Sequence, residues 1–318
     1  MKRIGTDAKN VPLYELSTNP VVVNAIRRTM LQNVPTFAFD TENIVVTRMK
    51  SAIYDADYIR LRISNMPVVE GPTEEEFRKF LEENQDWVLN NDPEGLTTEI
   101  KGITMSCAIH HTKGGDDILN VTTDMCTFTK DGKPIKNPYP TPILICKLKK
   151  EESIDFSATA TLNIPHQSAI FHPVYRCYFT EESGDKHHMR IASRTNIDED
   201  ILLRRAVEII RMRIDHFLGI IGSENTETGG KIVFPFDRFT LPQLFTDYIQ
   251  DHPAVDYAGY KCDHLLGTQG TIFYRANAPL SLIMSEVAKR IHEDLDELQG
   301  SAKKKPPRKP ATKSRKRA

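Results

Sequence analysis

Apolar residues recur at helical spacing along two long segments of the chain. From residue 203 to 221 they advance by four, three, four, three and four positions, which places them on one face of a helix. A second series of this kind runs from residue 280 to 298. We predict that the two apolar faces pack against each other, the alternative being that each belongs to an ordinary core. The predicted seam consists of Leu203, Val207, Ile210, Ile214, Phe217 and Ile221 on the first helix and of Leu280, Met284, Val287, Ile291, Leu295 and Leu298 on the second.

A shorter amphipathic helix is predicted over residues 20–33, where Asn19 or the threonine before it can cap the first turn. Its apolar side chains fall on one side, so the adjacent Arg27 and Arg28 are placed on its flank. On spacing alone these arginines are either docking residues for another protein or a solvated basic flank. A Val-Pro turn then leads into a strand predicted from residue 36 to 47.

The middle of the chain has a mixed pattern. Residues 74–89 form an acidic amphipathic segment, which predicts a helix that covers a sheet. Residues 143–150 and 154–162 are rich in apolar and β-branched residues, which indicates two strands. The two strands are separated by only a few residues.

Strands and helices also alternate in the last third of the chain. A strand is predicted at residues 231–236, and a helix begins at Thr240 with Gln243 three residues later, a spacing typical of a capping box. Two strands that we expect to pair follow at residues 255–260 and 270–274. The second long apolar face comes after them.

Charge is distributed unevenly along the 318 residues. The chain has 42 Lys or Arg and 43 Asp or Glu residues, but nine of the basic residues and none of the acidic ones lie in residues 300–318. We expect this basic tail to be disordered, whereas the rest of the chain carries an excess of ten acidic residues. An acidic body is a poor non-specific ligand for nucleic acid, because that affinity depends on clustered Lys and Arg.

The cysteines and histidines do not form a metal-binding pattern. The five cysteines are widely spaced and include no Cys-x-x-Cys pair, which indicates reduced thiols in an intracellular protein and neither a structural metal nor a cofactor. His110–His111 and His187–His188 are adjacent pairs, whose members would face opposite ways on a strand. The sequence also lacks a phosphate-binding loop and a nucleophile elbow, so we expect a non-catalytic protein. It has no apolar run long enough to span a membrane.

The most specific motif lies between Asn24 and Asp40. It reads Asn-Ala-Ile-Arg-Arg and then Val-Pro-Thr-Phe-Ala-Phe-Asp. This resembles the opening motif, Asn-Ala-x-Arg-Arg with Val-Pro-Thr-x-Ala-x-Asp, of the assembly subunits of multi-subunit RNA polymerases. These are bacterial alpha, archaeal D and the third-largest subunit of eukaryotic RNA polymerase II.

The last third resembles a second member of the same machine, archaeal L or the eleventh subunit of RNA polymerase II. The similarity lies in Thr240-Leu241, in Ala258-Gly259-Tyr260 and in His264, followed by the final helix. Pro242 and Gln243 depart from that family's Gly-Asn. The whole chain therefore resembles a single-chain fusion of two assembly subunits, as in large cytoplasmic DNA viruses.

The resemblance implies an α+β fold. Two dimerisation units like the alpha N-terminal domain, each made of strands and a long C-terminal helix, would pack as an intramolecular pseudo-heterodimer with an inserted mixed α/β subdomain. The expected divisions are residues 1–67 and 176–222 for the first unit, 68–175 for the insert, 223–230 for a linker, 231–299 for the second unit and 300–318 for the tail.

The implied function is that of a non-catalytic assembly platform of a DNA-dependent RNA polymerase. Its expected partners are the second-largest subunit, docked by Arg27 and Arg28, the largest subunit, and small subunits of the ten and twelve type. DNA would be met only through the assembled polymerase, and no membrane is expected. A viral protein of this kind would act in the cytoplasmic viral factory and the virion, with the host nucleus as the alternative.

One rival interpretation remains open. The chain can instead be a nucleic-acid-binding accessory protein that acts through the basic residues between Lys303 and Arg317.

Overall fold

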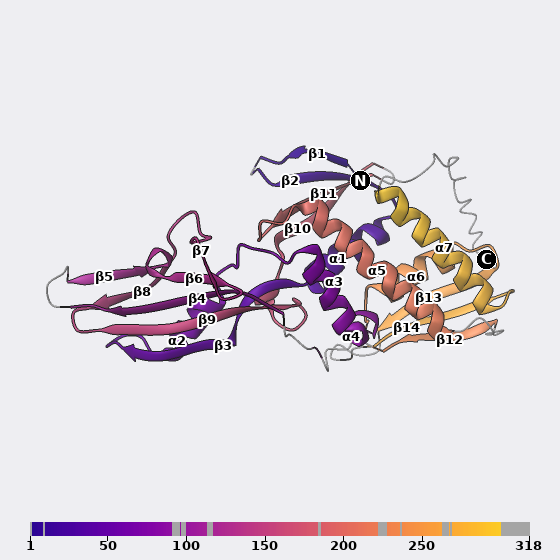
Figure 1. Cartoon of the computed structure of the whole chain (residues 1–318). Helices are drawn as coiled ribbons and strands as arrows, with labels where there is room; N and C mark the ends of the chain where they lie inside the picture. Colours follow the sequence, from indigo (N-terminus) through magenta and orange to yellow (C-terminus); the bar gives the residue numbers. More distant parts are fainter. Residues whose placement is uncertain are drawn as a thin grey trace.

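The computed structural model describes residues 2–8, 10–90, 96, 100–112, 117–183, 186–221, 228–235, 237–262, 267 and 269–299. The chain forms a body, in which helices lie between two sheets, and an arm of long strands that extends to one side (Figure 1). The predicted tail and most of the predicted linker lie outside the described residues.

The arm is a five-stranded antiparallel sheet with a two-stranded sheet beside it. The order of the large sheet is β3-β9-β4-β6-β7, and β5 pairs with β8. The two strands predicted at 143–150 and 154–162 are confirmed as β8 and β9, although they belong to different sheets. The elements of the arm are β3 (Thr36–Lys50), α2 (Ala56–Ser64), β4 (Lys101–His110), β5 (Ile118–Thr122), β6 (Thr127–Lys130), β7 (Lys133–Ile135), β8 (Leu144–Lys149) and β9 (Ser153–Asn163).

The pairing of β3 bears on the predicted division at residue 68, which stays a prediction. That division places β3 and α2 in the first dimerisation unit, but β3 pairs with β9 along most of its length and α2 packs on β3. The arm therefore begins near residue 36. The pairing is irregular at two places, between Phe39 and Ile44 and between Val46 and Arg48. At the first, Phe39 lies opposite Ala160 and Ile44 lies opposite Ala158, so residues 40–43 form a bulge.

The first part of the body is a four-stranded antiparallel sheet covered by helices. Its order is β1-β2-β11-β10, and α1 packs between β10 and α5. Asn19 caps α1, because its side-chain oxygen accepts the N–H of Val21 at 3.0 Å. The elements are β1 (Lys2–Thr6), β2 (Pro12–Ser17), α1 (Pro20–Gln32), β10 (Val174–Ser183), β11 (Lys186–Ser193) and α5 (Glu199–Ile221).

The acidic segment at 74–89 forms two helices, α3 (Glu74–Glu83) and α4 (Gln85–Asn90). The interruption falls at Asn84, whose side-chain amide donates to the carbonyl of Phe80 at 2.9 Å and competes with the helical pattern. The prediction that this segment covers a sheet is wrong, because α4 packs against α5. Two of its rings, Phe77 and Trp87, lie against the arginines Arg205 and Arg213 of α5.

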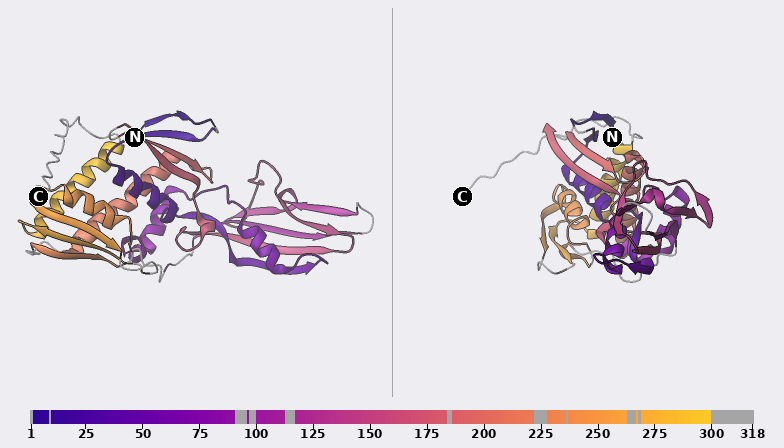
Figure 2. Two further views of the ribbon diagram at one scale, coloured as in Figure 1. Left: turned by 180° about the vertical axis from the view of Figure 1, so that it is seen from behind. Right: turned by 90° about the vertical axis from the view of Figure 1, so that its left-hand side faces the viewer.

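The last part of the chain forms a three-stranded antiparallel sheet of order β12-β14-β13, with helices on one of its faces (Figure 2). The predicted pairing of the strands at 255–260 and 270–274 is confirmed by β13 and β14. The elements are β12 (Gly229–Phe234), α6 (Leu241–Gln250), β13 (Val255–Cys262), β14 (Gly270–Ala276) and α7 (Leu280–Gln299).

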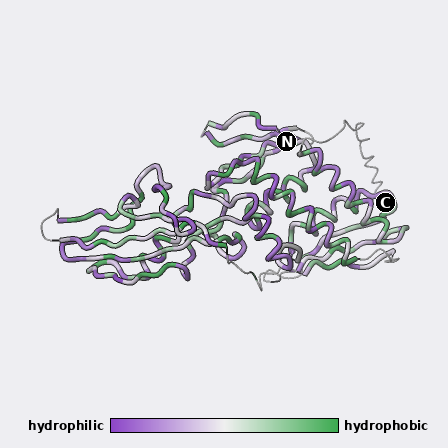
Figure 3. The backbone as a smooth tube through the Cα atoms, in the orientation of Figure 1, coloured by the Kyte–Doolittle hydropathy of each residue, from purple (hydrophilic) through white to green (hydrophobic). Residues whose placement is uncertain are grey.

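Buried apolar side chains of the arm and of the body belong to one contiguous cluster. Hydrophobic and hydrophilic stretches alternate along the helices and along the strands of both parts (Figure 3). Across the described residues, no helix combines the length and the apolar character that crossing a membrane requires.

Candidate functional site

The helices α5 and α7, which carry the twelve residues of the predicted seam, are in contact with each other (Figure 1). All of them are buried except Ile221, which is partly buried. At the rim, Nη2 of Arg211 lies 2.6 Å from Oδ1 of Asp296, and Nε2 of His292 lies 2.9 Å from Oδ1 of Asp215. The contact joins the first half of the chain, up to residue 221, to the second half, from residue 228 onward.

We call the region where the two halves meet the joint. A cluster of three phenylalanines belongs to it. Phe217 of α5 stacks on Phe234 of β12 with ring centroids 4.0 Å apart, and Phe245 of α6 lies 5.5 and 6.0 Å from the two. Aromatic pairs in such arrangements stabilise a structure by about 0.5–1.5 kcal/mol beyond the burial of their area. The apolar part of the joint therefore receives one ring from each of three elements: α5 of the first half, and α6 and β12 of the second.

Asp237 organises the polar side of the joint. Its Oδ1 accepts the N–H groups of Phe239 and Thr240 at 3.0 and 2.7 Å, and its Oδ2 accepts that of Leu241 at 2.9 Å. This carboxylate therefore caps α6. The predicted capping box between Thr240 and Gln243 is wrong, because Asp237 already satisfies the N–H groups at the start of the helix.

Arg28 is bound by the second half of the chain. Its Nε donates to the Thr240 hydroxyl at 3.1 Å, and its guanidinium lies 5.1 Å from the ring centre of Phe239. Arg238 lies 4.7 Å from the same ring. Burial lowers the pKa of Arg28, and the nearby Asp237 carboxylate opposes that shift. A cation–π contact together with a hydrogen bond makes Arg28 part of the joint.

Arg213 contributes a second cation from the first half. It is fully buried on α5, and this desolvation lowers the pKa of Arg213 to about 10 although Asp237 acts in the opposite direction. Its Nη1 donates to Oδ1 of Asn33 at 3.3 Å, and its guanidinium lies 5.7 Å from the ring centre of Trp87. The joint thus holds two arginines of one half near a carboxylate of the other.

Arg27 is arranged differently. Its Nε and Nη2 donate to Oδ1 of Asn24, one turn earlier on α1, at 3.1 and 2.9 Å. The side chain is half-buried, and within the described part of the chain no carboxylate forms an ion pair with it. The structure therefore separates the two predicted docking residues: Arg28 is engaged inside the molecule, and Arg27 is held in place with donors to spare.

Asp237 and Arg213 are residues at the contact of the two halves that the sequence pattern did not reveal. Asp237 has a local signal, because an acidic residue shortly before a Leu-Pro helix start is a capping candidate. Arg213 has no local signal: it stands between Met212 and Ile214 in a helix, and only its neighbours from other elements show that it is buried.

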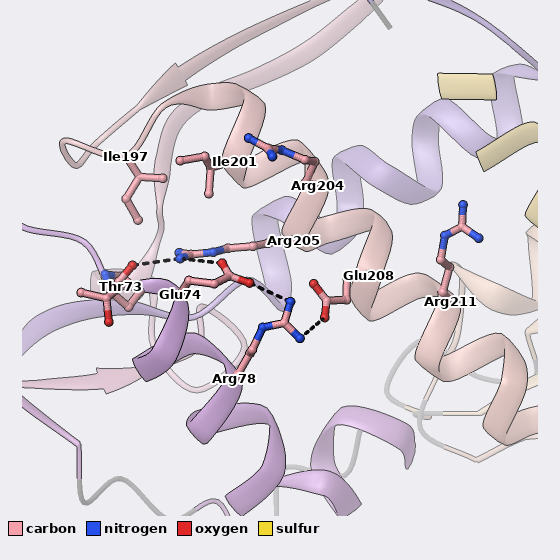
Figure 4. Close-up of a pocket in the computed structure, with 10 residues that line it drawn as sticks. Thr73, Glu74, Arg78, Ile197, Ile201, Arg204, Arg205, Glu208 and Arg211 are labelled. Atoms are coloured by element: carbon pink, nitrogen blue, oxygen red, sulfur yellow. Dashed lines mark hydrogen bonds and ion pairs between the residues drawn. The ribbon is translucent and has the colours of Figure 1, made fainter. Parts of the chain in front are cut away.

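A cavity of about 630 Å³ lies between α3 and α5 (Figure 4). Arg78 lies 3.0 Å from Glu74 and 3.7 Å from Glu208, and Arg205 lies 3.6 Å from Glu74 while it donates to the carbonyl of Pro72. These interactions join α3 to α5, and we assign them a structural role. The lining residues are Pro72, Thr73, Glu74, Arg78, Ile197, Ile201, Arg204, Arg205, Glu208 and Arg211.

Among the described residues, no group of three or more His, Cys, Asp or Glu is arranged to hold a metal ion. His187 and His188 face opposite ways, as predicted: His187 is buried with Nε2 3.1 Å from the carbonyl of Thr18, and His188 lies 2.8 Å from Glu182. The absence of a metal from the native protein stays a prediction.

Two comparisons with known proteins bear on this arrangement. The family model of the RNA polymerase Rpb3/Rpb11 dimerisation domain matches residues 15–214. A protein of Acanthamoeba polyphaga mimivirus, provisionally named a DNA directed RNA polymerase subunit, is 20% identical over 288 residues, which cover 83% of this chain and 81% of the relative. The family match includes α1 and most of α5, and it ends before the second half.

Proposed function

The chain belongs to the family of RNA polymerase Rpb3/Rpb11 dimerisation domains, and from this premise we propose that it is the assembly platform of a multi-subunit DNA-dependent RNA polymerase. In this role it performs no catalysis. It holds the second-largest and largest subunits in fixed positions, together with small subunits. The relative from a large DNA virus supports a place in viral transcription.

The platform consists, in this proposal, of two dimerisation units in one chain. Residues up to 222 form the first unit with its arm, and residues 231–299 form the second. The contact of α5 with α7 supports this division, since it joins a helix of the first half to a helix of the second and the apolar faces of both helices are buried. Covalent connection makes the association intramolecular, which corresponds to an effective concentration in about the millimolar range.

The observation that carries the proposal is the joint around Asp237. It brings a carboxylate from the second half to Arg28 and Arg213 of the first, and the three phenylalanines close the same junction. The attraction between this carboxylate and the two guanidinium groups favours one arrangement of the two halves, because displacement of either half would weaken it. A platform needs this fixed geometry in order to present two subunits at a constant separation.

Arg27 is the residue that we propose to dock the second-largest subunit. Asn24 fixes the guanidinium in one orientation, so little side-chain entropy is lost when a partner binds. A planar guanidinium can grip a carboxylate with two parallel hydrogen bonds. We assign Arg28 the different role of holding α6 against α1.

The arm offers a second contact for the same partner. Three apolar side chains on α2 and the loop before it are exposed, and Tyr58 stacks on Tyr54 with ring centroids 4.9 Å apart. An exposed apolar patch of this kind is typical of an interaction site. The patch consists of Ile53, Tyr58 and Leu61.

Co-expression with the second-largest subunit tests the docking proposal. Arg27→Ala should reduce capture of that subunit at least tenfold with an unchanged melting temperature, because truncating one partner of a buried charge pair costs about 2–5 kcal/mol. Arg3→Ala, at an exposed arginine of β1, is the control and should leave both unchanged. Undiminished capture by the Arg27 variant would return this residue to the solvated-flank interpretation.

A further inference from the structure

In the part of the chain that the structure describes, the helices of the second half lie on one face of its sheet and leave the other face uncovered by a helix (Figure 1). Along β14, Ile272, Tyr274 and Ala276 point inward and are buried, while the alternate residues Phe273 and Arg275 point outward and are exposed. Phe273 is 40% exposed, although a phenylalanine ring would ordinarily be buried.

Neighbouring strands add an aromatic ring and two more cations to this face. The antiparallel register places Tyr257 opposite Arg275, and it places both Gly259 and Lys231 opposite Phe273. All nine outward positions of the three strands are described, and none of them is acidic. The outer sheet face, as we name it, has five side chains that are aromatic or basic: Lys231, Tyr257, Lys261, Phe273 and Arg275.

The ring of Tyr257 is laid across the sheet. A Cβ atom at Gly259 would collide with the hydroxyl and the ring of Tyr257, so only glycine leaves room for this position. One side of the ring therefore rests on the backbone of β13, and 56% of the tyrosine remains exposed. Such a ring is held as a flat platform instead of projecting freely into solvent.

We propose that the outer sheet face binds single-stranded nucleic acid. The two rings stack on unpaired bases, and the cations beside them contact the phosphates. Stacking of bases on aromatic side chains over an antiparallel sheet is a general mode of single-strand recognition, and it tolerates any sequence because every base has a π-face.

The local charge decides between this ligand and an acidic protein segment. The body is acidic as a whole, so Lys231 and Arg275 on a face whose nine outward positions include no carboxylate are a local exception that favours a polyanion, and the exposed Asp256 in the bulge before Tyr257 is the carboxylate beside it. A protein partner of acidic character would satisfy the cations but would not require two rings lying flat. The proposal thus departs from the expectation that the chain meets nucleic acid only through the assembled polymerase.

The test is a titration of the full chain into a fluorescein-labelled fifteen-nucleotide thymidine oligomer and into the matching duplex, followed by fluorescence anisotropy. Tyr257→Ala and Phe273→Ala should each weaken binding of the single strand about fivefold or more, and the duplex much less. Tyr175→Ala is the matched control, because this tyrosine is 64% exposed on β10 beside Arg176 and lies outside the proposed face.

Lys231→Gln gives a second measurement that does not depend on ring packing. It should reduce the slope of log affinity against log salt concentration by about one, as expected for one lost phosphate contact. Each variant is first checked for an unchanged melting temperature.

Three outcomes would overturn the proposal. The first is that the wild-type protein does not bind the single-stranded oligomer. Binding that is equal for single strand and duplex and unaffected by the three variants would assign the affinity to the basic tail. Unchanged oligomer binding combined with weaker capture of the largest polymerase subunit would make this face a protein interface.

Discussion

At the scale of single residues, one carboxylate determines much of how the halves fit. Asp237 accepts three backbone N–H groups, and its charge partly offsets the lowering of the pKa of Arg28 and Arg213 that burial causes. A buried charge with several partners is costly to remove, because its partners remain behind without compensation.

We therefore expect Asp237→Ala to lower the free energy of unfolding by about 3 kcal/mol, which combines the loss of a helix cap with the loss of a counter-charge. Urea denaturation followed by circular dichroism measures the change. Asp256→Ala is a suitable control, since that aspartate is exposed and accepts only the side chain of Asn277. A loss below about 1 kcal/mol at Asp237 would show that the joint does not depend on it.

At the scale of helices and strands, the sequence predicted the features that depend on periodicity, such as the buried faces of helices. It missed the features that depend on contacts between residues far apart in the chain. The apolar faces of α5 and α7 follow from spacing alone, and both are buried. Thr240 matched a capping pattern, yet its hydroxyl is taken by Arg28, which is 212 positions away in the chain. The two adjacent arginines were recognisable from their motif, but the different surroundings of Arg27 and Arg28 depend on which side chains of the second half reach them.

The seam itself can be tested with two isoleucines of one helix. Ile214 is fully buried, and Ile220 is 62% exposed. Ile214→Asp should cost about 4 kcal/mol or more, because it buries an unpaired carboxylate. Ile220→Asp should change the free energy of unfolding by about 0.5 kcal/mol or less. Similar thermal midpoints for the two variants would contradict a buried seam at this position.

In the arm, a carboxylate at the turn between β8 and β9 accepts hydrogen bonds whose strength depends on pH. Burial raises the pKa of Glu152. The carboxylate oxygens accept hydrogen bonds from the N–H groups of Ala52 and Lys149, with N···O distances of 2.7 and 2.8 Å. These bonds, together with neighbouring groups, outweigh the effect of burial, so the pKa lies below its ordinary value of 4.5. Stability from a carboxyl with a lowered pKa is fully present above 4.5 and is lost as the pH falls below it. Protonation would therefore loosen the loop after β3.

The expected result is a steeper loss of thermal stability below about pH 4.5 in the wild type than in Glu152→Gln, which cannot titrate. Melting temperatures measured between pH 7 and pH 3 give the comparison. If the melting temperatures of the two proteins fall in parallel with pH, Glu152 does not contribute to the loss of stability in acid.

At the scale of the whole molecule, the two halves depend on each other more than on the chain that connects them. Each half places a long helix with a buried apolar face at the joint, and the polar contacts around Asp237 cross it as well. A half on its own would expose that face to water, at about 1.5–3 kcal/mol for each large side chain.

A protease site inserted between residues 223 and 227 should therefore be cut without separating the halves. After cleavage, the two fragments should elute together in size-exclusion chromatography, because the joint is non-covalent and extensive. The same cleavage in the Ile214→Asp variant should release the second half. Separation of the wild-type fragments would indicate that the covalent link, and not the joint, holds the protein together.

The bulge at residues 40–43 has a consequence for how such a platform can change over time. Residues 36–39 lie next to the helix that bears Arg27, whereas residues 44–50 lie further out in the arm, and β9 runs past both without a comparable interruption. Adding or removing a residue in this loop would re-aim the arm while leaving the pairing at either end intact. On the proposed function, insertion or deletion in this bulge would change the distance between two bound subunits while the surfaces that recognise those subunits stay the same.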